Sequence, residues 1–300
     1  MTLITTPFGP KATAAQILDG VDLGGRRYIV TGGSSGIGRA TTEALRGAGA
    51  EVTVATRSPG PGERHVDLTD LDSVATFVAG WSGPLDGIVA NAGIMALPRR
   101  ETSRDGWELQ LATNFLGHFA LITGLRENLR GGRVAIVSSG AQLRAPFDFD
   151  DPQFERRPYD RWAAYSRSKT AGVLLAVAIG RRWPGDGIAA NALDPGYIHT
   201  RLQRHVDRAT MRGFGGMDAD GNLIMPDFYK TPEQGAATSV LLVASPLLDG
   251  VTGRYFLDNR QAPTGPGGPD APAGTVADWS VDPAAADRLW DLALTVTAGR

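Results

Sequence analysis

A glycine-rich turn between an apolar strand and a helix constrains the fold of this chain more than any other feature. The apolar run Tyr28, Ile29 and Val30 predicts a strand, and a helical pattern begins near Ala40. Glycine allows a positive φ and a close approach of backbone to ligand, and a helix N-terminus attracts phosphate. A purely structural turn is the alternative, but the strand–turn–helix order favours a dinucleotide site. The residues predicted to bind are Gly32, Ser34, Ser35, Gly36, Ile37 and Gly38.

Strand-like and helix-like segments then alternate without a break along the chain. Repeated strand–helix units predict a single doubly wound, Rossmann-type α/β domain, with a seven-stranded parallel sheet covered by helices on both faces. The expected strands are residues 27–31, 51–56, a third ending near Val66, 86–90, 133–138, 188–193 and 254–257. The expected helices end near Ala48, follow Asp70, and cover 105–129, 161–183 and 283–297, with capping boxes at 13–16 and 231–234.

The chain divides into an N-terminal arm (1–24), a catalytic domain (25–261) and a C-terminal part (262–300). Within the domain, residues 140–161 form an insertion and 200–230 a substrate loop. Residues 262–274 are rich in proline and glycine, which predicts a flexible segment. The helix that follows is expected to pack on the domain or on another subunit.

Tyr165 and Lys169 stand four residues apart, which places both side chains on one face of a helix. Arginine dominates the basic residues, so a lysine here suggests a need for a compact ammonium. A cation about 4 Å away stabilises a phenolate, and Lys169 is therefore predicted to lower the pKa of Tyr165 toward neutral pH. An ordinary amphipathic helix is the alternative reading of this pair.

Taken together, these features resemble the short-chain dehydrogenase/reductase superfamily in its compact form. The resemblance spans about residues 28–257, with Gly33 and Ala90 as minor departures from its motifs. Ser139 and Tyr165 are 26 positions apart, about twice the usual spacing, and this resembles the branch of retinol dehydrogenases and WW-domain oxidoreductases. Besides the glycine turn and the Tyr165–Lys169 pair, the matching motifs are Asp67-Leu68, Asn91-Ala92-Gly93, Asn114, Val137-Ser138-Ser139 and Pro195-Gly196.

The resemblance implies a role for each of these residues. Tyr165 is the general acid in reduction and the base in oxidation, assisted by Lys169, which also holds the nicotinamide ribose. Ser139 binds the substrate oxygen, and Asn114 joins Lys169 to a water chain that resupplies protons. The remaining cofactor contacts come from Asp67, Leu68, Asn91, Ala92, Gly93, Pro195, Gly196, Ile198 and Thr200.

The end of the second strand indicates which nicotinamide cofactor binds. An acid there would bind the adenosine ribose hydroxyls of NAD, but the position holds Thr56, followed by Arg57. Glu51 is at the opposite end of the strand, roughly 16 Å away. A neutral residue followed by arginine suits a 2′-phosphate, which favours NADP over NAD. The alternative is that Arg57 is a solvated loop cation.

Composition excludes several functions. The net charge of −2 has no basic stripe, which argues against nucleic acid and anionic membrane as partners. The chain has no cysteine, and its four histidines lack ligand spacing, so no metal site is expected. His118 is interpreted as a structural or solvated residue on a helix face. The sequence shows no signal peptide and no apolar run long enough to span a bilayer, which predicts a soluble cytoplasmic protein. The family adds a homodimer or homotetramer as the expected assembly.

The predicted function is NADP(H)-dependent oxidation and reduction by hydride transfer, which interconverts a carbonyl compound (a ketone or an aldehyde) and the corresponding alcohol. Apolar residues of the 201–229 segment, among them Phe214, favour an apolar substrate of moderate size, whereas Arg144, Arg201 and Arg204 leave an acidic group as an alternative. Two other functions stay open. One is an NADP-binding sensor or scaffold without turnover, and the other is an isomerase or lyase that uses the nicotinamide transiently.

Overall fold

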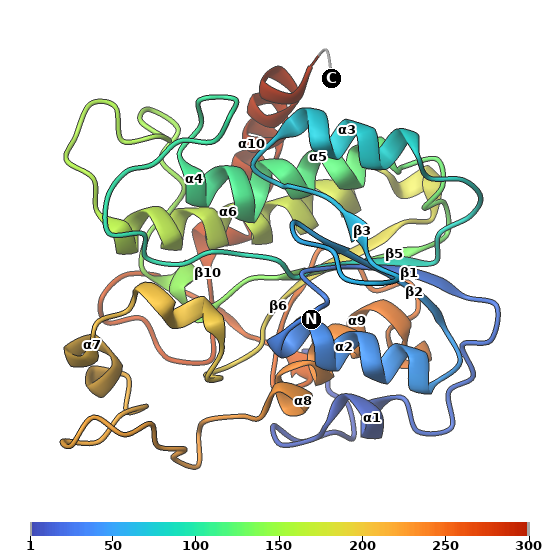
Figure 1. Cartoon of the computed structure of the whole chain (residues 1–300), viewed down its shortest axis with the longest axis horizontal. Helices are drawn as coiled ribbons and strands as arrows, with labels where there is room; N and C mark the ends of the chain where they lie inside the picture. The colour runs from blue at the N-terminus through green and yellow to red at the C-terminus, as the bar shows by residue number, and fades with distance from the viewer. Residues whose placement is uncertain (1, 299–300) are drawn as a thin grey trace.

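The computed structural model describes residues 2–298. A twisted sheet lies between two layers of helices, as in a doubly wound α/β fold (Figure 1). The strand order is β3-β2-β1-β4-β5-β6-β7-β8, and the first seven strands are parallel. The strands are β1 (Arg27–Thr31), β2 (Glu51–Thr56), β3 (Arg64–His65), β4 (Gly87–Ala90), β5 (Arg133–Val137), β6 (Ala189–Asp194), β7 (Tyr255–Leu257) and β8 (Arg260–Gln261).

The predicted fold class is confirmed, with one added strand. β8 pairs antiparallel with β7 through a tight turn, in which Asp258 and Asn259 have positive φ. Antiparallel strands can be joined by a two-residue turn, so the short β8 extends the edge of the sheet without a crossover helix.

Helices cover both faces of the sheet and bury two apolar cores (Figure 1). The central strands are buried on both faces, which is why their sequences are continuous apolar runs. One layer holds α3 (Leu71–Ala79), α4 (Leu109–Leu111), α5 (Gly117–Gly124), α6 (Arg161–Arg182) and α10 (Pro283–Thr297). The other holds α1 (Ala14–Ile17), α2 (Gly36–Gly47), α8 (Pro232–Gly235) and α9 (Ala237–Ala244), while α7 (Arg208–Gly213) lies in the substrate loop.

The helix predicted over residues 105–129 is wrong in its extent. The Glu108 carboxylate accepts hydrogen bonds from the amides of Gln110 and Leu111, and this N-cap starts α4 only at Leu109. A π-helix over Ala112–Leu116 follows, and α5 ends at Gly124. The predicted helix at 161–183 and both predicted capping boxes are confirmed.

Both ends of the described chain pack on the domain. The backbone amide of Gln261 donates to Ile4 O at 2.9 Å, which ties the arm to β8. At the other end α10 packs on α6, where Trp290 meets the ring of Trp183 edge to face. The segment predicted to be flexible has defined contacts, because Thr264–Gly265 (β9) pairs with Val276–Ala277 (β10).

Candidate active site

The glycine turn has the geometry of a phosphate cradle. Gly32 and Gly36 have φ of +64° and +52°, which side chains other than glycine rarely adopt. Ser35 is the N-cap of α2, yet its side chain makes no capping hydrogen bond, so the first amides of α2 are free to face an anion. A methyl group at Gly38 would overlap the carbonyl oxygen of Gly32. The turn therefore fits the pyrophosphate of a dinucleotide.

The turn after β4 is hydrogen-bonded to Thr31, the residue that precedes the glycine turn. The Thr31 hydroxyl accepts hydrogen bonds from the amides of Asn91 and Ala92 at 2.9 and 3.0 Å. The side-chain amide of Asn91 returns a hydrogen bond to Thr31 O at 2.9 Å. Asn91, Ala92 and Gly93 thus lie beside the glycine turn, as the sequence predicted for residues that support one cofactor.

A buried histidine extends this connection to Asn114. His118 Nε2 lies 2.9 Å from the Thr31 hydroxyl, and its Nδ1 lies 3.3 Å from Asn114 O. Burial lowers the pKa of His118 to about 4, so the ring is neutral at pH 7. From the sequence, His118 was only a helix-face residue without a function. In the structure it links the glycine turn to the predicted proton relay.

We expect His118 to make folding sensitive to acid. The unfolded chain takes up this proton near pH 6.5 and the folded chain only near pH 4, so stability falls as pH drops through this window. The full shift corresponds to about 3 kcal/mol of unfolding free energy. Urea unfolding of His118→Gln between pH 7 and pH 4 should lack this loss. His65→Gln, on exposed β3, should keep it, and an equal response of the two variants would contradict the assignment.

Helix α6 places Tyr165 and Lys169 at the carboxyl end of β5. Asp160 caps the helix by accepting from the amides of Trp162 and Ala163, both at 2.8 Å. Both functional side chains are buried, and Lys169 Nζ lies 5.6 Å from the centre of the Tyr165 ring. The ammonium donates to Val137 O at 2.9 Å. Burial lowers the pKa of Lys169 to about 8.

The predicted lowering of the Tyr165 pKa by Lys169 is wrong. Burial is the largest influence and raises this pKa, a hydrogen bond with Ser139 opposes the rise, and the charge of Asp194 adds to it. The phenol is therefore protonated at neutral pH, which is the state that a general acid needs. The contact between Tyr165 and Ser139 brings together two residues that are 26 positions apart.

Asn114 lies in the π-helix, a feature that often marks functional sites. Its side-chain oxygen accepts from the amide of Ile94 at 2.9 Å, and its side-chain nitrogen donates to Ile94 O and to Ser168 Oγ. A methyl group on Gly93 would lie 3.1 Å from Asn114 Oδ1 and 3.7 Å from Lys169 Nζ. The structure therefore brings Asn114 and Lys169 to the same side of the turn after β4.

The segment after β6 returns to the glycine turn. The Gly196 amide donates to Asp194 Oδ1 at 2.9 Å, and the buried Ile198 packs against α8 at Gly235. A methyl group on Gly36 would lie 3.3 Å from the side chain of Thr200. Of the residues predicted in this segment, Thr200 therefore lies beside the glycine turn and Ile198 beside α8.

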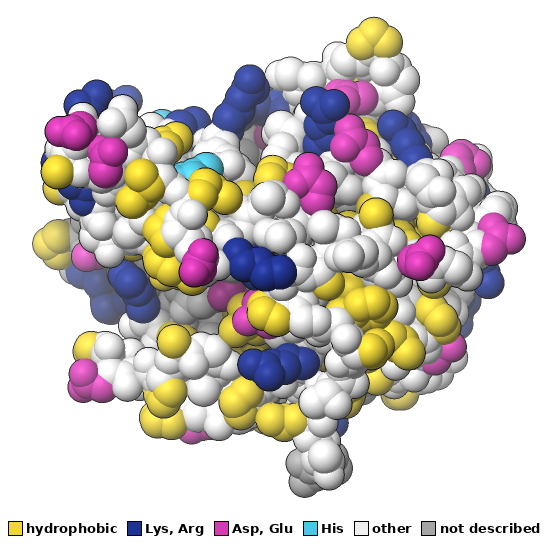
Figure 2. Space-filling view, turned by 90° about the horizontal axis from the view of Figure 1, so that it is seen from below, with side chains coloured by type: hydrophobic (Ala, Val, Ile, Leu, Met, Phe, Trp, Pro, Cys, Tyr) yellow, Lys and Arg dark blue, Asp and Glu magenta, His cyan; other side chains and the backbone are white. Residues whose placement is uncertain are grey.

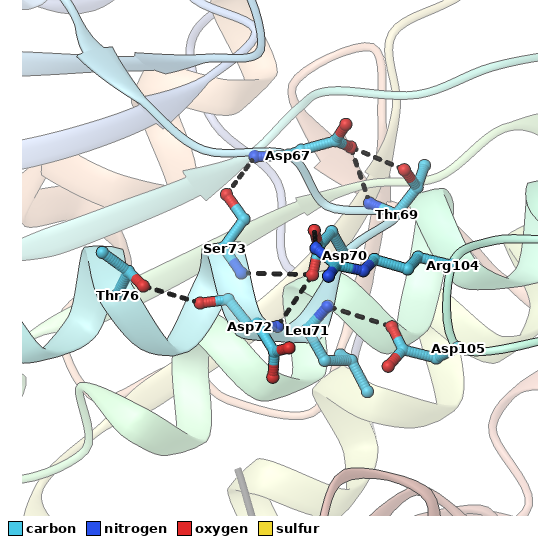
Figure 3. A network of polar contacts seen from close by, with 9 residues as sticks. All are labelled: Asp67, Thr69, Asp70, Leu71, Asp72, Ser73, Thr76, Arg104 and Asp105. Atoms are coloured by element: carbon cyan, nitrogen blue, oxygen red, sulfur yellow. Dashed lines mark hydrogen bonds and ion pairs between the residues drawn. The ribbon is translucent and has the colours of Figure 1, made fainter.

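The predicted adenine end of the site comes from the turn between β3 and α3 (Figure 3). The Asp67 carboxylate accepts hydrogen bonds from the amide and the hydroxyl of Thr69, at 2.9 and 2.7 Å, and these bonds stabilise the turn. Asp70 caps α3 and pairs with Arg104 at 2.8 Å, and this pairing lowers the pKa of Asp70. Leu68 is buried beside α5, while Arg57 is exposed after β2.

An apolar cluster lies around Tyr165. Met95, Ala96 and Tyr165 are its buried members, and the partly buried side chains that pack against it are Ala141, Trp162, Leu202 and Val206. Trp162 meets the ring of Phe214 of the substrate loop edge to face, with centroids 5.7 Å apart. Sequence reasoning found Phe214 but missed Met95 and Trp162, although Trp162 stands three positions before Tyr165 on α6.

Other parts of the substrate loop face outward. Met225 and Phe228 are each 54% exposed, and Arg201 and Arg204 are at the surface. Figure 2 shows basic and acidic side chains interspersed on one face, with apolar side chains between them. Among residues 2–298 no helix is long and apolar enough to cross a membrane, and no His, Cys, Asp or Glu cluster suits a metal ion.

Known proteins resemble this chain over most of its length. The family model described as short chain dehydrogenase matches residues 26–210. A Streptomyces lividans protein described as "Probable oxidoreductase" is 59% identical over 93% of this chain and all of that protein. Human retinol dehydrogenase 14 is 32% identical, over 89% of this chain and 85% of its own. An uncharacterized protein from Mycobacterium paratuberculosis has a solved structure with a TM-score of 0.73 at 30% identity, covering 96% of this chain and 97% of its own.

The chain belongs to the short-chain dehydrogenase family. It is an oxidoreductase of that family, with retinol dehydrogenases among its relatives.

Proposed function

We propose that this protein is an NADP(H)-dependent oxidoreductase that interconverts a ketone or aldehyde and an alcohol. One observation supports this above the others: Tyr165 contacts Ser139 at the carboxyl end of β5, while Lys169 and Asn114 approach the same turn after β4. An acid, a donor to the substrate oxygen and a proton supply are the groups that carbonyl reduction needs.

The roles of the residues follow from their protonation states. When bound, the nicotinamide supplies or accepts the hydride. Tyr165, protonated at neutral pH, donates its proton to the carbonyl oxygen during reduction, and Ser139 hydrogen-bonds the same oxygen. Lys169 returns a proton to Tyr165 and is recharged from solvent through the water chain that Asn114 would join, and the lowered pKa of Lys169 suits it to exchange protons near working pH. In oxidation the same groups take the proton in the opposite direction.

The glycine turn and α2 would hold the pyrophosphate, and Asn91, Ala92 and Gly93 would support the nicotinamide half. Arg57 is exposed directly after β2, so its guanidinium is available to a 2′-phosphate. The neutral Thr56 before it offers no carboxylate to the ribose hydroxyls. These two residues support NADP in preference to NAD.

Replacing Arg57 with alanine should weaken NADPH binding by about tenfold or more, because a charge-assisted hydrogen bond to the phosphate is lost. NADH binding should change little, since NADH lacks that phosphate. Titration of both cofactors by calorimetry with the wild-type protein and Arg57→Ala measures the difference. Equal losses for the two cofactors would remove the argument for NADP.

The cluster around Tyr165 supports an apolar substrate. Met95 is buried in one cluster with Tyr165, and the apolar side chains of Trp162, Leu202 and Val206 pack against this cluster. The arginines that could have bound an acidic group, Arg201 and Arg204, lie at the surface instead. A moderately sized apolar ketone, aldehyde or alcohol therefore fits this site best.

The test is an absorbance assay of NADPH and, separately, NADH against a panel of apolar and acidic carbonyl compounds. Turnover with NADPH and an apolar compound is the expected result. Tight binding of NADPH without turnover of any compound, together with cofactor that co-purifies and is not consumed, would favour the sensor or scaffold function instead.

A further inference from the structure

Gln142 is a fully buried polar residue that follows Ser139 by three positions. Both lie in the 3-10 turn at the carboxyl end of β5, where Ser139 is the N-cap of the helix Gly140–Leu143. The amide of Gln142 donates to Ser139 O at 3.1 Å, and the Ser139 hydroxyl accepts from the amide of Ala141 at 3.2 Å. Any shift of Gln142 is therefore passed to Ser139 through this short turn.

The side chain of Gln142 binds a segment that lies more than 130 positions further along the chain. Its oxygen accepts from the amide of Ala277 at 3.0 Å and from the hydroxyl of Ser280 at 2.9 Å. Its nitrogen donates to Thr275 O at 3.1 Å. A side-chain amide supplies both the donor and the acceptor that these contacts need, and a carboxylate or an apolar side chain of similar size would leave buried groups unpaired.

The backbone oxygen of Gln142 adds two contacts. It accepts from the indole nitrogen of Trp279 at 3.0 Å and from the hydroxyl of Thr170 at 3.4 Å. Thr170 follows Lys169 on α6 and also donates to Ala145 O at 2.8 Å. Gln142 thus connects three segments: the turn that carries Ser139, the helix that carries Lys169, and the C-terminal residues 275–280.

Residues 275–280 are themselves held in place. The pairing of β9 with β10 fixes one side, and the amide of Gly268 donates to Leu143 O at 2.7 Å. The ring of Trp279 lies so close to Gly267 that a methyl group there would overlap it. Helix α10, which follows, packs on α6. The family match ends at residue 210, so β9, β10, Trp279 and α10, which hold this segment, lie outside the matched part of the chain.

We propose that residues 275–280 are a positioning element of the active site, which acts through Gln142 to hold Ser139 against Tyr165. This rests on the proposed function, because it assigns the segment to the residue that would bind the substrate oxygen. Gln142 touches neither cofactor nor substrate in this role. Residues 275–280 would then contribute to catalysis indirectly, by fixing the position of Ser139.

The test compares the wild-type protein with Gln142→Met, which keeps the side-chain volume and removes the three side-chain hydrogen bonds. We expect kcat to fall by about tenfold to a hundredfold, as small displacements of catalytic groups do, while NADPH affinity stays within about twofold. The deuterium isotope effect with NADPH labelled at the transferred hydride should rise, because hydride transfer becomes slower. A purely structural role would reduce the amount of active protein and leave the isotope effect unchanged.

Two further variants separate positioning from stability. Ser280→Ala breaks the contact from the other side and should lower kcat in the same direction, with little further loss when combined with Gln142→Met. Arg182→Ala is the matched control, since it breaks the contacts of Arg182, on α6, with Asp287 and Asp291 of α10 without touching Gln142. The kcat of Arg182→Ala should match that of the wild type, even where its thermal stability falls as far as that of Gln142→Met. A loss of kcat in Arg182→Ala as large as in Gln142→Met would overturn the proposal.

Hydrogen exchange distinguishes failure of this proposal from failure of the proposed function. Amides of the turn 139–143 should exchange faster in Gln142→Met than in the wild type, whether or not a substrate has been found. Unchanged exchange would overturn the positioning role. A wild-type protein that turns over no carbonyl compound, with faster exchange in the variant, would count against the proposed function and leave the link between the two segments standing.

Discussion

Replacing Tyr165 with phenylalanine is expected to lower kcat by about a thousandfold. The ring and its packing against Met95 and Ala96 are retained, so the change removes only the hydroxyl that contacts Ser139. Loss of a positioned general acid costs about 10²- to 10⁴-fold in rate. Steady-state kinetics with the best compound of the panel measures the loss, and NADPH titration should show affinity within a few-fold of the wild type.

The matched control is Tyr28→Phe, another buried tyrosine, which lies on β1 in the opposite core. It should retain the kcat of the wild type. If Tyr165→Phe kept more than about a tenth of the wild-type rate, Tyr165 would not be the general acid. The raised pKa of Tyr165 adds a second check, because ionisation of this phenol should not limit reduction at neutral or mildly alkaline pH, and a fall in rate near pH 8 is expected only from deprotonation of Lys169.

Gly38→Ala is expected to damage both the fold and cofactor binding. The new methyl group would overlap the carbonyl oxygen of Gly32 and lie 2.5 Å from the side-chain nitrogen of Asn91, neither of which can move without opening the turn. Overpacking of this kind costs about 1–3 kcal/mol of unfolding free energy. Because the displaced atoms form the cradle, NADPH affinity should fall by at least about tenfold. Urea unfolding and calorimetric titration measure the two effects.

Gly47→Ala, at the last residue of the same helix α2, provides the comparison. No atom lies within 4 Å of the methyl group that it would add. Alanine favours helix over glycine by up to about 1 kcal/mol, so stability should hold or rise and NADPH affinity should not change. Wild-type NADPH affinity in Gly38→Ala would mean that the glycine turn is structural and does not hold the cofactor.

The predicted site residues come from eight segments of the chain, four of which follow β1, β4, β5 and β6. Parallel strands place their carboxyl ends on the same side, which brings the turns after β1, β4, β5 and β6 together. Thr31 with Asn91, and Ser139 with Tyr165, are pairs that this topology makes adjacent. The predicted parallel sheet implied that these turns lie on the same side of the sheet, although not which atoms would bond.

Other features of the site could not be predicted in this way. His118 looked like one more residue on a helix face, and Gln142 had no pattern to mark it. Trp162 stands three positions before Tyr165, outside the Tyr165–Lys169 pair to which the sequence analysis gave a role. The direction of the Tyr165 pKa shift was also predicted wrongly, because burial of the phenol, which the sequence does not reveal, outweighs the effect of a nearby cation.

The sequence by itself determined the fold class, the position of the glycine turn and the Tyr165–Lys169 face of α6. Each depends on local rules: strand and helix periodicity, backbone freedom of glycine, and the four-residue repeat of a helix turn. Only the tertiary structure decided that Gln142 joins the catalytic turn to residues 275–280, that His118 joins Thr31 to Asn114, and that burial dominates the pKa of Tyr165. The two contacts and the pKa shift arise because segments far apart in the sequence pack together and exclude water, and no local pattern of residues encodes that packing.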